Sequence, residues 1–349
     1  MSATVNRTDN TQYKGIDVLK FIMALFVVVL HTHPLYQVSG VMNFLTADVI
    51  ARVAVPFFFT ATGFLLEKQI GGNGADAKDV IRGYIRKILG LYCIWTMIYL
   101  PVIIYDKILD SDDTLIRGVL TIVRDFIFVG SYAHLWYLPA VAVGIAMVYF
   151  LRKHLGEHKT AVFLMILFLA GLLTQSYFGL FTTAVGADDI LWKIMKAVKK
   201  VMVTCRNGVF FGSIFIYMGT WIARCNITIK RWKAVIGLTI SLLIFIMEAA
   251  CLWEARYVRE SDMYIMLIPS VFFLMMLAKQ TSVRGDTTFI RKMSMNIYYV
   301  HMYFKFIYLK GFGVHNINYI GLFWFTLSGA LITAYLMYRA VYPVHKRKA

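Results

Sequence analysis

The sequence predicts an all-α polytopic membrane protein with about ten transmembrane helices. Hydrophobic residues make up 59% of the chain and charged residues only 16%, whereas soluble domains are nearer one half and one quarter. Apolar segments of about 17 to 25 residues recur along the whole sequence, and each is long enough to cross a bilayer as a helix. Residues 1–349 are therefore expected to form a single multi-pass membrane domain.

Ten apolar segments account for this pattern. In chain order, we expect spans at about residues 16–33, 48–66, 84–104, 135–151, 160–176, 205–223, 234–253, 262–279, 293–310 and 318–339. The first span follows a polar segment, residues 1–13, and no small-residue cleavage site comes after it. It is therefore expected to remain as an anchor rather than to be removed as a signal peptide.

The charges of the loops predict the orientation. Lys and Arg gather in the loops after the even-numbered spans and in the basic tail at residues 340–349. The first outer loop, residues 34–47, contains neither, and residues 106–125 are acidic. Because cytoplasmic loops collect Lys and Arg, both termini are expected to be cytoplasmic.

Two further segments are expected to lie at the membrane interface. Residues 114–131 are partly apolar but contain three charged side chains, so they are expected at the outer interface or as a re-entrant segment. Residues 189–205 predict an amphipathic helix with lysines on one face and Ile, Leu, Met and Val on the other. The ten-span topology places this helix on the outer side of the membrane, although basic segments are normally cytoplasmic. Either it contacts an anionic surface polymer, or a nearby span is miscounted.

The charge and the cysteines exclude other classes. The net charge of +17 is expected from cytoplasmic loops, so nucleic-acid binding is not predicted. The cysteines at positions 93, 205, 225 and 251 fit neither a disulfide framework nor metal-ligand spacing. We therefore expect them to be small apolar residues or unpaired thiols, and we expect no metal site.

Lys20 and His31 mark the first candidate site, within the first span. Eleven residues at about 100° each return a helix to within about 20° of its starting face, roughly 16 Å further along the axis. Asp17 falls near the same stripe. Such groups are costly in a membrane unless they face protein or water, so the stripe indicates a functional site. Alternatively, Asp17 and Lys20 mark the headgroup boundary, which leaves His31 unexplained.

Other polar or aromatic residues are expected in the outer half of the membrane or near its middle. They are Arg52, His134, Trp136, Arg206, Asn207, Tyr298 and His301. Each also has a structural interpretation: an arginine can reach the headgroups, a tryptophan can belong to the aromatic belt, and a buried histidine can be satisfied by packing. Their convergence with His31 favours a functional site.

The chemistry that fits these residues is group transfer without a protein nucleophile. A histidine can act as a general base toward a hydroxyl, and a deeper cation can hold an anionic donor. The sequence contains no nucleophile elbow, Walker loop, dinucleotide-binding glycine motif or metal-binding histidine pair. These absences make hydrolase, ATPase and redox functions poor candidates.

At these residues the chain resembles the acyltransferase-3 family of integral-membrane acyltransferases. The resemblance covers essentially the whole chain and depends on three motifs. These are Ile-Asp-Val-Leu-Lys at 16–20 with His31, Arg-Val-Ala-Val-Pro-Phe-Phe-Phe at 52–59, and Ser-Met-Asn-Ile-Tyr at 294–298 with His301. The family more often has arginine at the position of Lys20. A lysine keeps the charge without the planar fork, so charge pairing is expected there.

The resemblance implies transfer of an acyl group, usually acetyl, from cytoplasmic acetyl-CoA to a hydroxyl of an extracytoplasmic cell-envelope glycan or lipid-linked acceptor. It implies a multi-pass protein of a bacterial cytoplasmic membrane in which His31 is the catalytic base or an acyl relay, with Lys20 and Asp17 as further catalytic residues on the same stripe. The donor phosphates would be bound by Lys20, Arg82, Arg86 and Lys87.

Within this family, three motifs are most similar to the membrane half of vancomycin-resistance-type serine racemases. They are residues 52–59, His-Leu-Trp-Tyr-Leu-Pro at 134–139, and Arg-Asn-Gly-Val-Phe-Phe at 206–211. Those proteins add a soluble racemase domain, which this sequence lacks, so racemase activity is not expected of this chain alone. The branch suggests a second hypothesis, a membrane transporter for a small polar solute such as serine. A membrane sensor or scaffold has no positive support in the sequence.

Overall fold

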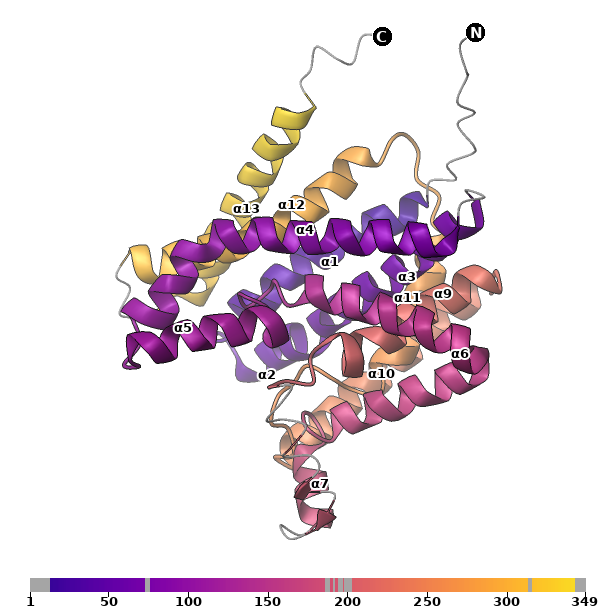
Figure 1. The fold of residues 1–349 in the computed structure, drawn as a ribbon, viewed down its shortest axis with the longest axis horizontal. Helices are drawn as coiled ribbons and strands as arrows, with labels where there is room; N and C mark the ends of the chain where they lie inside the picture. The colour runs from indigo at the N-terminus through magenta and orange to yellow at the C-terminus, as the bar shows by residue number, and fades with distance from the viewer. Residues whose placement is uncertain are drawn as a thin grey trace.

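The computed structural model describes residues 13–72, 76–185, 189–190, 192–193, 197, 203–312 and 316–342. These residues contain helices and connections but no strand, which confirms the predicted all-α class (Figure 1). The α-helices are α1 (Lys14–Thr32), α2 (Gly40–Asn43), α3 (Ala54–Gly72), α4 (Ala77–Ile104), α5 (Leu115–Arg124), α6 (Tyr137–Leu172), α7 (Phe178–Ala184), α9 (Ser213–Arg224), α10 (Arg231–Glu254), α11 (Leu267–Gln280), α12 (Thr288–Phe306) and α13 (Tyr319–Val341). Short π- or 3₁₀-helical turns adjoin them: η1 (Phe44–Val49), η2 (Ile50–Val53), η3 (Tyr105–Leu109), η4 (Asp125–Val129), η5 (Gly208–Gly212) and η6 (Ile307–Gly311).

Six helical segments are long and apolar enough to cross a membrane. They are Lys14–Thr32, Gly40–Gly72, Ala77–Leu109, Tyr137–Leu172, Arg231–Glu254 and Tyr319–Val341. The predicted spans at 205–223 and 262–279 correspond to shorter apolar helices, and the span at 293–310 corresponds to α12 with η6. The chain is therefore a multi-pass membrane protein, while the number ten and the orientation of the ends stay predictions.

Gly156 divides α6 into two helical arms. Its backbone has φ 74° and ψ 177°, a conformation that favours glycine because a side chain would be strained there. The two arms correspond to the predicted spans at 135–151 and 160–176. Next to the break, the carboxylate of Glu157 accepts hydrogen bonds from Arg152 (3.0 Å) and Arg224 (2.8 Å), which ties the break to α9.

Glycines let α3 and α9 pack at very short range. A Cβ atom on Gly63 would lie 2.1 Å from the carbonyl oxygen of Ile216, and one on Gly219 would lie 2.0 Å from that of Thr60. Both distances are far inside van der Waals contact, so neither position has room for a side chain. Small residues at such contacts are typical of membrane helix packing.

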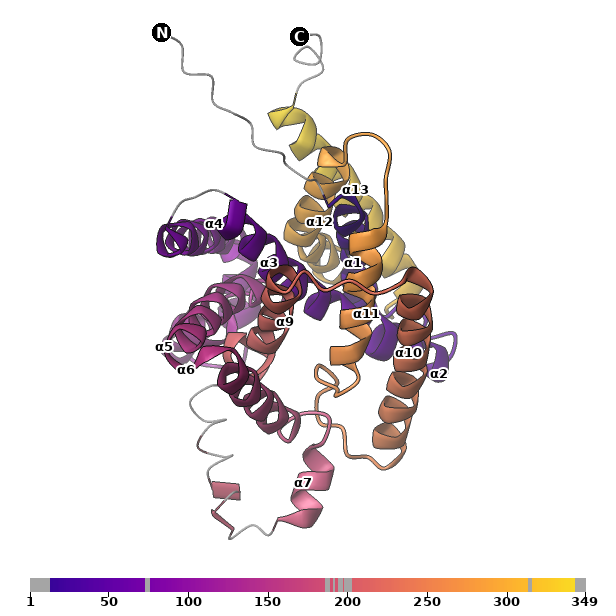
Figure 2. The same cartoon turned by 90° about the vertical axis from the view of Figure 1, so that its right-hand side faces the viewer.

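Helix α1 begins and helix α13 ends on the same side of the molecule. Gly15 lies against Ala278 and Thr281 at the end of α11, and the ring of Tyr338 in α13 lies 5.0 Å from that of Phe289 at the start of α12. This arrangement agrees with both termini being on the same side. In Figures 1 and 2, α7 lies at the opposite end from α12 and α13.

The predicted interfacial segments are only partly described. Most of the helix predicted at 189–205, the segment 1–12 and residues 343–349 of the tail lie outside the described residues. Residues 114–131 contain α5 and η4, which leave the apolar side chains of Leu115, Ile116 and Leu120 exposed. This exposure agrees with an interfacial position.

Candidate active site

Two helices that are distant in sequence, α1 and α12, pack side by side in parallel. Near their starts, the hydroxyl of Thr287 donates to the Asp17 carboxylate (2.7 Å). Further along, the hydroxyl of Ser294 donates to the carbonyl oxygen of Lys20 (2.9 Å). Near their ends, the rings of His31 and His301 are 5.3 Å apart between centroids. The polar stripe predicted on α1 is thus matched by a second polar stripe on α12.

A cavity of about 270 Å³ lies along these stripes. Phe58, Ile88 and Tyr137 line it and also contact both apolar cores of the molecule, so the cavity lies between the cores. Its polar or charged lining comes from α1, α3, α6 and α12 and from the connection before α6: Lys20, His31, Thr62, His134, Trp136, Tyr137, Arg291, Ser294, Tyr298 and Tyr299.

His301 lies between His31 and His134. Its ring centroid is 5.3 Å from that of His31 and 5.1 Å from that of His134. The Nδ1 atom faces the carbonyl oxygens of Tyr298 (2.9 Å) and Ile297 (3.1 Å), which can only accept, so Nδ1 carries the hydrogen. Nε2 then holds a lone pair, and it makes no hydrogen bond with any described residue. This imidazole is therefore oriented by its own helix and presents a free acceptor.

His134 is positioned through its backbone. It precedes α6, and its carbonyl oxygen accepts a hydrogen bond from the Tyr298 hydroxyl (2.9 Å). The ring packs against Tyr99 at a centroid distance of 4.9 Å and is almost fully buried. Neither ring nitrogen has a hydrogen-bond partner among the described residues. Buried polar atoms are normally satisfied, so these orphaned nitrogens indicate a site that takes a polar ligand or water.

Two cations lie at the inner end of the cavity, meaning the end near the starts of α1 and α12. Lys20 and Arg291 both line it, and their charges interact with each other. The charge of Asp17 also acts on Lys20, but this carboxylate is buried and accepts from Thr287 rather than lining the cavity. Asp17 therefore lies behind the site, where it joins α1 to the start of α12.

The other predicted donor residues lie in a second space. A groove of about 1090 Å³ runs between α4 and the first arm of α6, and its basic lining consists of Lys78, Arg82, Arg86, Lys153 and His154. Lys87 is exposed and lines neither space. The structure thus separates Lys20 from Arg82 and Arg86, because Lys20 lines the cavity on one side of α4 and the two arginines line the groove on its other side. On α4 itself, Ile88 faces the cavity and Leu89 faces the groove.

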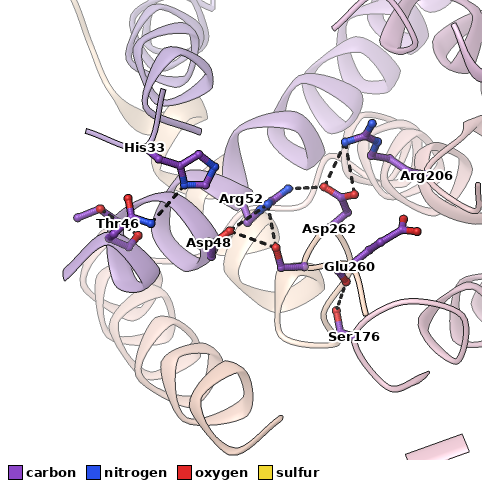
Figure 3. A network of polar contacts seen from close by, with 10 residues as sticks. His33, Thr46, Asp48, Arg52, Ser176, Arg206, Glu260 and Asp262 are labelled. Atoms are coloured by element: carbon purple, nitrogen blue, oxygen red, sulfur yellow. Dashed lines mark hydrogen bonds and ion pairs between the residues drawn. The ribbon is translucent and has the colours of Figure 1, made fainter. Parts of the chain in front are cut away.

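An ion-pair network lies at the outer end, near the ends of α1 and α12 (Figure 3). Asp262, in the connection between α10 and α11, pairs with Arg52 of η2 and with Arg206 before η5 (3.4 Å). Arg52 also pairs with Asp48 (3.2 Å) and donates to the hydroxyl of Ser261 (2.9 Å). Burial alone would raise the pKa of Asp262, but Arg206 and Arg52 hold the pKa of this carboxyl below its usual range.

The connection that carries Asp262 is fixed from several sides. The hydroxyl of Ser176 donates to the carbonyl oxygens of Met263 and Glu260. The carboxylate of Glu248 accepts from the backbone N–H groups of Ile265 (2.7 Å) and Met266 (2.9 Å). Asp262 is therefore presented by a braced loop.

Arg206 links the network to the cavity, whereas Asn207 has a structural role. The guanidinium group of Arg206 lies 5.1 Å from the ring centroid of Trp136, a residue of the cavity wall. The side chain of Asn207 accepts from the N–H groups of Val209 (2.9 Å) and Phe210 (3.0 Å) and so caps η5. Since this oxygen is already used, Asn207 contributes by fixing Arg206 rather than by reaching into the cavity.

Sequence reasoning missed Arg291, Lys305 and Asp262. Arg291 lies three residues before Ser294, and Lys305 lies four residues after His301, so helical spacing from two predicted residues would have found both. The partnership of Asp262 with Arg52 spans 210 positions and has no such local signal. Within the described residues, no group of three His, Cys, Asp or Glu side chains could hold a metal ion.

Comparison with known proteins identifies a family model that matches this chain. A family model described as an acyltransferase domain matches residues 13–339. Two amino-acid racemases of Enterococcus faecalis are each 30% identical, over 267 and 278 residues, which cover 76% and 77% of this chain and 36% and 38% of theirs. A serine/alanine racemase of Enterococcus gallinarum is 28% identical over 291 residues, 83% of this chain and 40% of the relative. The chain thus spans less than half the length of these relatives. No solved structure matches.

Proposed function

The chain belongs to the acyltransferase-3 family, and from this membership we propose that it is a membrane O-acyltransferase. In this proposal the acyl group, most simply acetyl, comes from cytoplasmic acyl-CoA. It passes to a hydroxyl of an extracytoplasmic glycan or lipid-linked acceptor of the cell envelope, across a bacterial cytoplasmic membrane. The observation that carries the proposal is the row of three imidazoles beside a cavity with a cation pair at its inner end.

In the proposed reaction, the acceptor hydroxyl attacks the thioester carbonyl carbon. His31 takes the hydroxyl proton as the new C–O bond forms, and it returns that proton to the coenzyme thiolate as the C–S bond breaks. The products are an ester and free coenzyme A, so no proton is gained or lost overall. No hydrogen bond from a described residue occupies the ring nitrogens of His31, which leaves them available for this transfer.

The donor is proposed to approach from the end where α1 and α12 begin. Lys20 and Arg291 would face its phosphates there, because a guanidinium and an ammonium bind phosphate by charge-assisted hydrogen bonds. The groove between α4 and α6 offers Arg82 and Arg86 as a second basic surface for the same nucleotide. Lys87 is exposed and would have at most a long-range electrostatic effect.

The test uses membranes that contain the full chain and labelled acetyl-CoA. We expect His31→Ala to reduce labelled ester in cell-envelope material by about 10²- to 10⁴-fold, the contribution typical of a general base. His33→Ala is the matched control, because His33 lies two residues away and contacts Asn43 instead of the cavity (Nδ1 to Nδ2, 3.3 Å). An undiminished signal in His31→Ala would contradict the catalytic role.

Transport of a small polar solute such as serine is the second candidate. The relatives named above as racemases favour it, together with polar groups distributed along the whole cavity. Labelled serine uptake into vesicles separates the two proposals. An acyltransferase without transport gives no uptake, whereas a transporter gives uptake without labelled ester.

A further inference from the structure

Lys305 is a cation without a counter-ion at the outer end of the site. It lies one helical turn beyond His301 on α12, so Tyr298, His301 and Lys305 follow one stripe. Its ammonium group makes no hydrogen bond or ion pair with any residue that the structure describes. Its charge nevertheless acts on both His31 and His301. An unpaired cation is costly in a membrane, so Lys305 marks a functional position.

Arg206 supplies a second donor without an acceptor at the same end. Its Nε atom is buried and makes no hydrogen bond within the described residues. One of its terminal nitrogens reaches Asp262 at 3.4 Å, the long end of an ion pair, and the charge of Arg206 also acts on His31. The guanidinium group therefore has hydrogen-bonding capacity that the described residues do not use.

The nearby carboxylates do not balance these cations. Asp262 already receives Arg52 and Arg206, and Asp48 receives Arg52 and the hydroxyl of Ser261. Both carboxylates are thus paired with arginines, and neither neutralises the positive charge of Lys305. The effect reaches His33, just after α1: burial lowers the pKa of His33, Asp48 offsets part of this, and Arg52 and Lys305 lower that pKa further.

Three further carboxylates, those of Asp106, Asp110 and Asp125, have partners of their own. Asp110 pairs with the ammonium group of Lys310 (2.6 Å), and Asp106 accepts from the hydroxyl of Tyr132 (3.3 Å). Asp125 pairs with Lys107 and Arg124. Each of these carboxylates has its own partner, so none of them is available to neutralise Lys305.

We propose that Lys305 and Arg206 bind an anionic oxygen group, a carboxylate or a phosphate, carried by the acceptor molecule. This inference rests on the proposed acyltransferase function and adds to it the chemical class of the acceptor. Binding the anion would supply the missing acceptor atoms to both donors. It would also hold a hydroxyl of the same molecule near His31, which is how a positioned substrate gains reactivity.

The experiment uses three small alcohols as probes: glycerol, glycerate and glycerol 3-phosphate. Purified full-length protein in lipid nanodiscs receives labelled acetyl-CoA, and the ester formed with each probe is measured. We expect transfer to at least one anionic probe to exceed transfer to glycerol by about tenfold, the contribution of one charge-assisted hydrogen bond. Faster reaction of glycerate identifies a carboxylate site, and faster reaction of glycerol 3-phosphate identifies a phosphate site.

Variants test whether Lys305 is the cause. Lys305→Gln should reduce the ratio of anionic to neutral transfer about tenfold, and Lys305→Arg should largely restore it. Lys310→Gln is the matched control, because Lys310 is an exposed lysine of η6 that pairs with Asp110. A wild-type protein that prefers glycerol, or an unchanged ratio in Lys305→Gln, would overturn the proposal.

A binding measurement distinguishes failure of this inference from failure of the proposed function. The melting temperature of the protein is recorded with and without each probe. If neither wild type nor His31→Ala transfers acetyl, but glycerate or glycerol 3-phosphate stabilises wild type and not Lys305→Gln, the anion site stands and the transferase proposal falls. If acetyl is transferred but Lys305→Gln changes neither the transfer ratio nor the stabilisation by the probes, the transferase proposal stands and the anion site falls. Absence of both effects contradicts both proposals.

Discussion

At the scale of single residues, Asp262 holds the outer end of the site together. Its carboxylate joins Arg52 and Arg206, which come from segments about 150 positions apart. The side chain of Asp262 is only 13% exposed, so solvent screens this interaction less than it would a surface pair. Removing one partner of such a group leaves the remaining charges uncompensated.

We expect Asp262→Asn to lower the free energy of unfolding by about 1–3 kcal/mol at neutral pH. Because the folded state holds the pKa of Asp262 below its usual value of about 4, the stabilisation is present above that pH. It is lost as the pH falls through the lowered pKa. Melting curves between about pH 3 and 7 should therefore converge for wild type and variant at the acid end.

Asp110→Asn is the control for that measurement, because Asp110 pairs with Lys310 on the surface. We expect the change in melting temperature of this variant to be small throughout. If Asp262→Asn were no more destabilising than Asp110→Asn at neutral pH, the network would not brace the outer end.

Prediction from sequence succeeds for residues that one helix brings together. The shared face of Lys20 and His31 follows from the pitch of a single helix, and the structure places both on the cavity wall. Arg52 and Arg206 were selected as unusual cations, but their common partner was not, because pairing across loops leaves no periodic pattern. The division of the donor residues between a cavity and a groove also depends on how α4 packs, which no local pattern encodes.

At the scale of elements, the contact between α3 and α9 is the tightest constraint on the fold. Gly63 and Gly219 each bring a backbone carbonyl of the neighbouring helix to where a Cβ would be. Of these two helices, α3 carries wall residues of the site, because Phe58 and Thr62 line the cavity. The close contact with α9 therefore fixes the position of a helix that forms part of the cavity wall.

We expect Gly219→Ala to lower the free energy of unfolding by about 1–3 kcal/mol, because the helices must separate to admit a methyl group 2.0 Å from the carbonyl oxygen of Thr60. Thermal unfolding in detergent measures the effect. Gly90→Ala in α4 is the matched control: nothing lies within 4 Å of its added Cβ, and alanine favours the helix. Equal melting temperatures for the two variants would contradict the tight contact.

Hydropathy predicted which segments are helical more accurately than it predicted where each helix begins and ends. The span predicted at 48–66 corresponds to α3, but that helix runs over Ala54–Gly72. It is preceded by the wider π-helical turn η1 and the tighter 3₁₀-helical turn η2. The apolar character continues through these turns, so composition alone does not show where regular helix begins. The break in α6 was predicted as a loop from the charges around it, and Gly156 supplies its backbone geometry.

At the scale of the whole molecule, α4 separates two spaces with basic linings. Lys20 and Arg291 face the cavity on one side, while Arg82 and Arg86 face the groove on the other. A long donor such as acyl-CoA has its reactive thioester far from its nucleotide, so one molecule could use both surfaces. Binding by the remote part would then affect affinity more than chemistry.

We expect Arg82→Gln and Arg86→Gln each to raise the KM for acyl-CoA about three- to tenfold with little change in kcat. Such a pattern reports contacts that are equal in the ground state and the transition state. Lys159→Gln, an exposed charge of the second arm of α6 away from the groove, is the control. Initial rates over a range of donor concentrations provide both constants, and a fall in kcat alone would argue against a remote binding surface.

The parallel packing of α1 against α12 also determines when the site can exist during synthesis. One wall is made within the first 32 residues, whereas the facing wall on α12 begins only at Thr288. Contacts of such long sequence separation form late. Until α12 is inserted, the polar stripe of α1 lies in the membrane without the α12 residues that pack against it. A growing chain therefore has no complete site until α12 has been inserted beside α1.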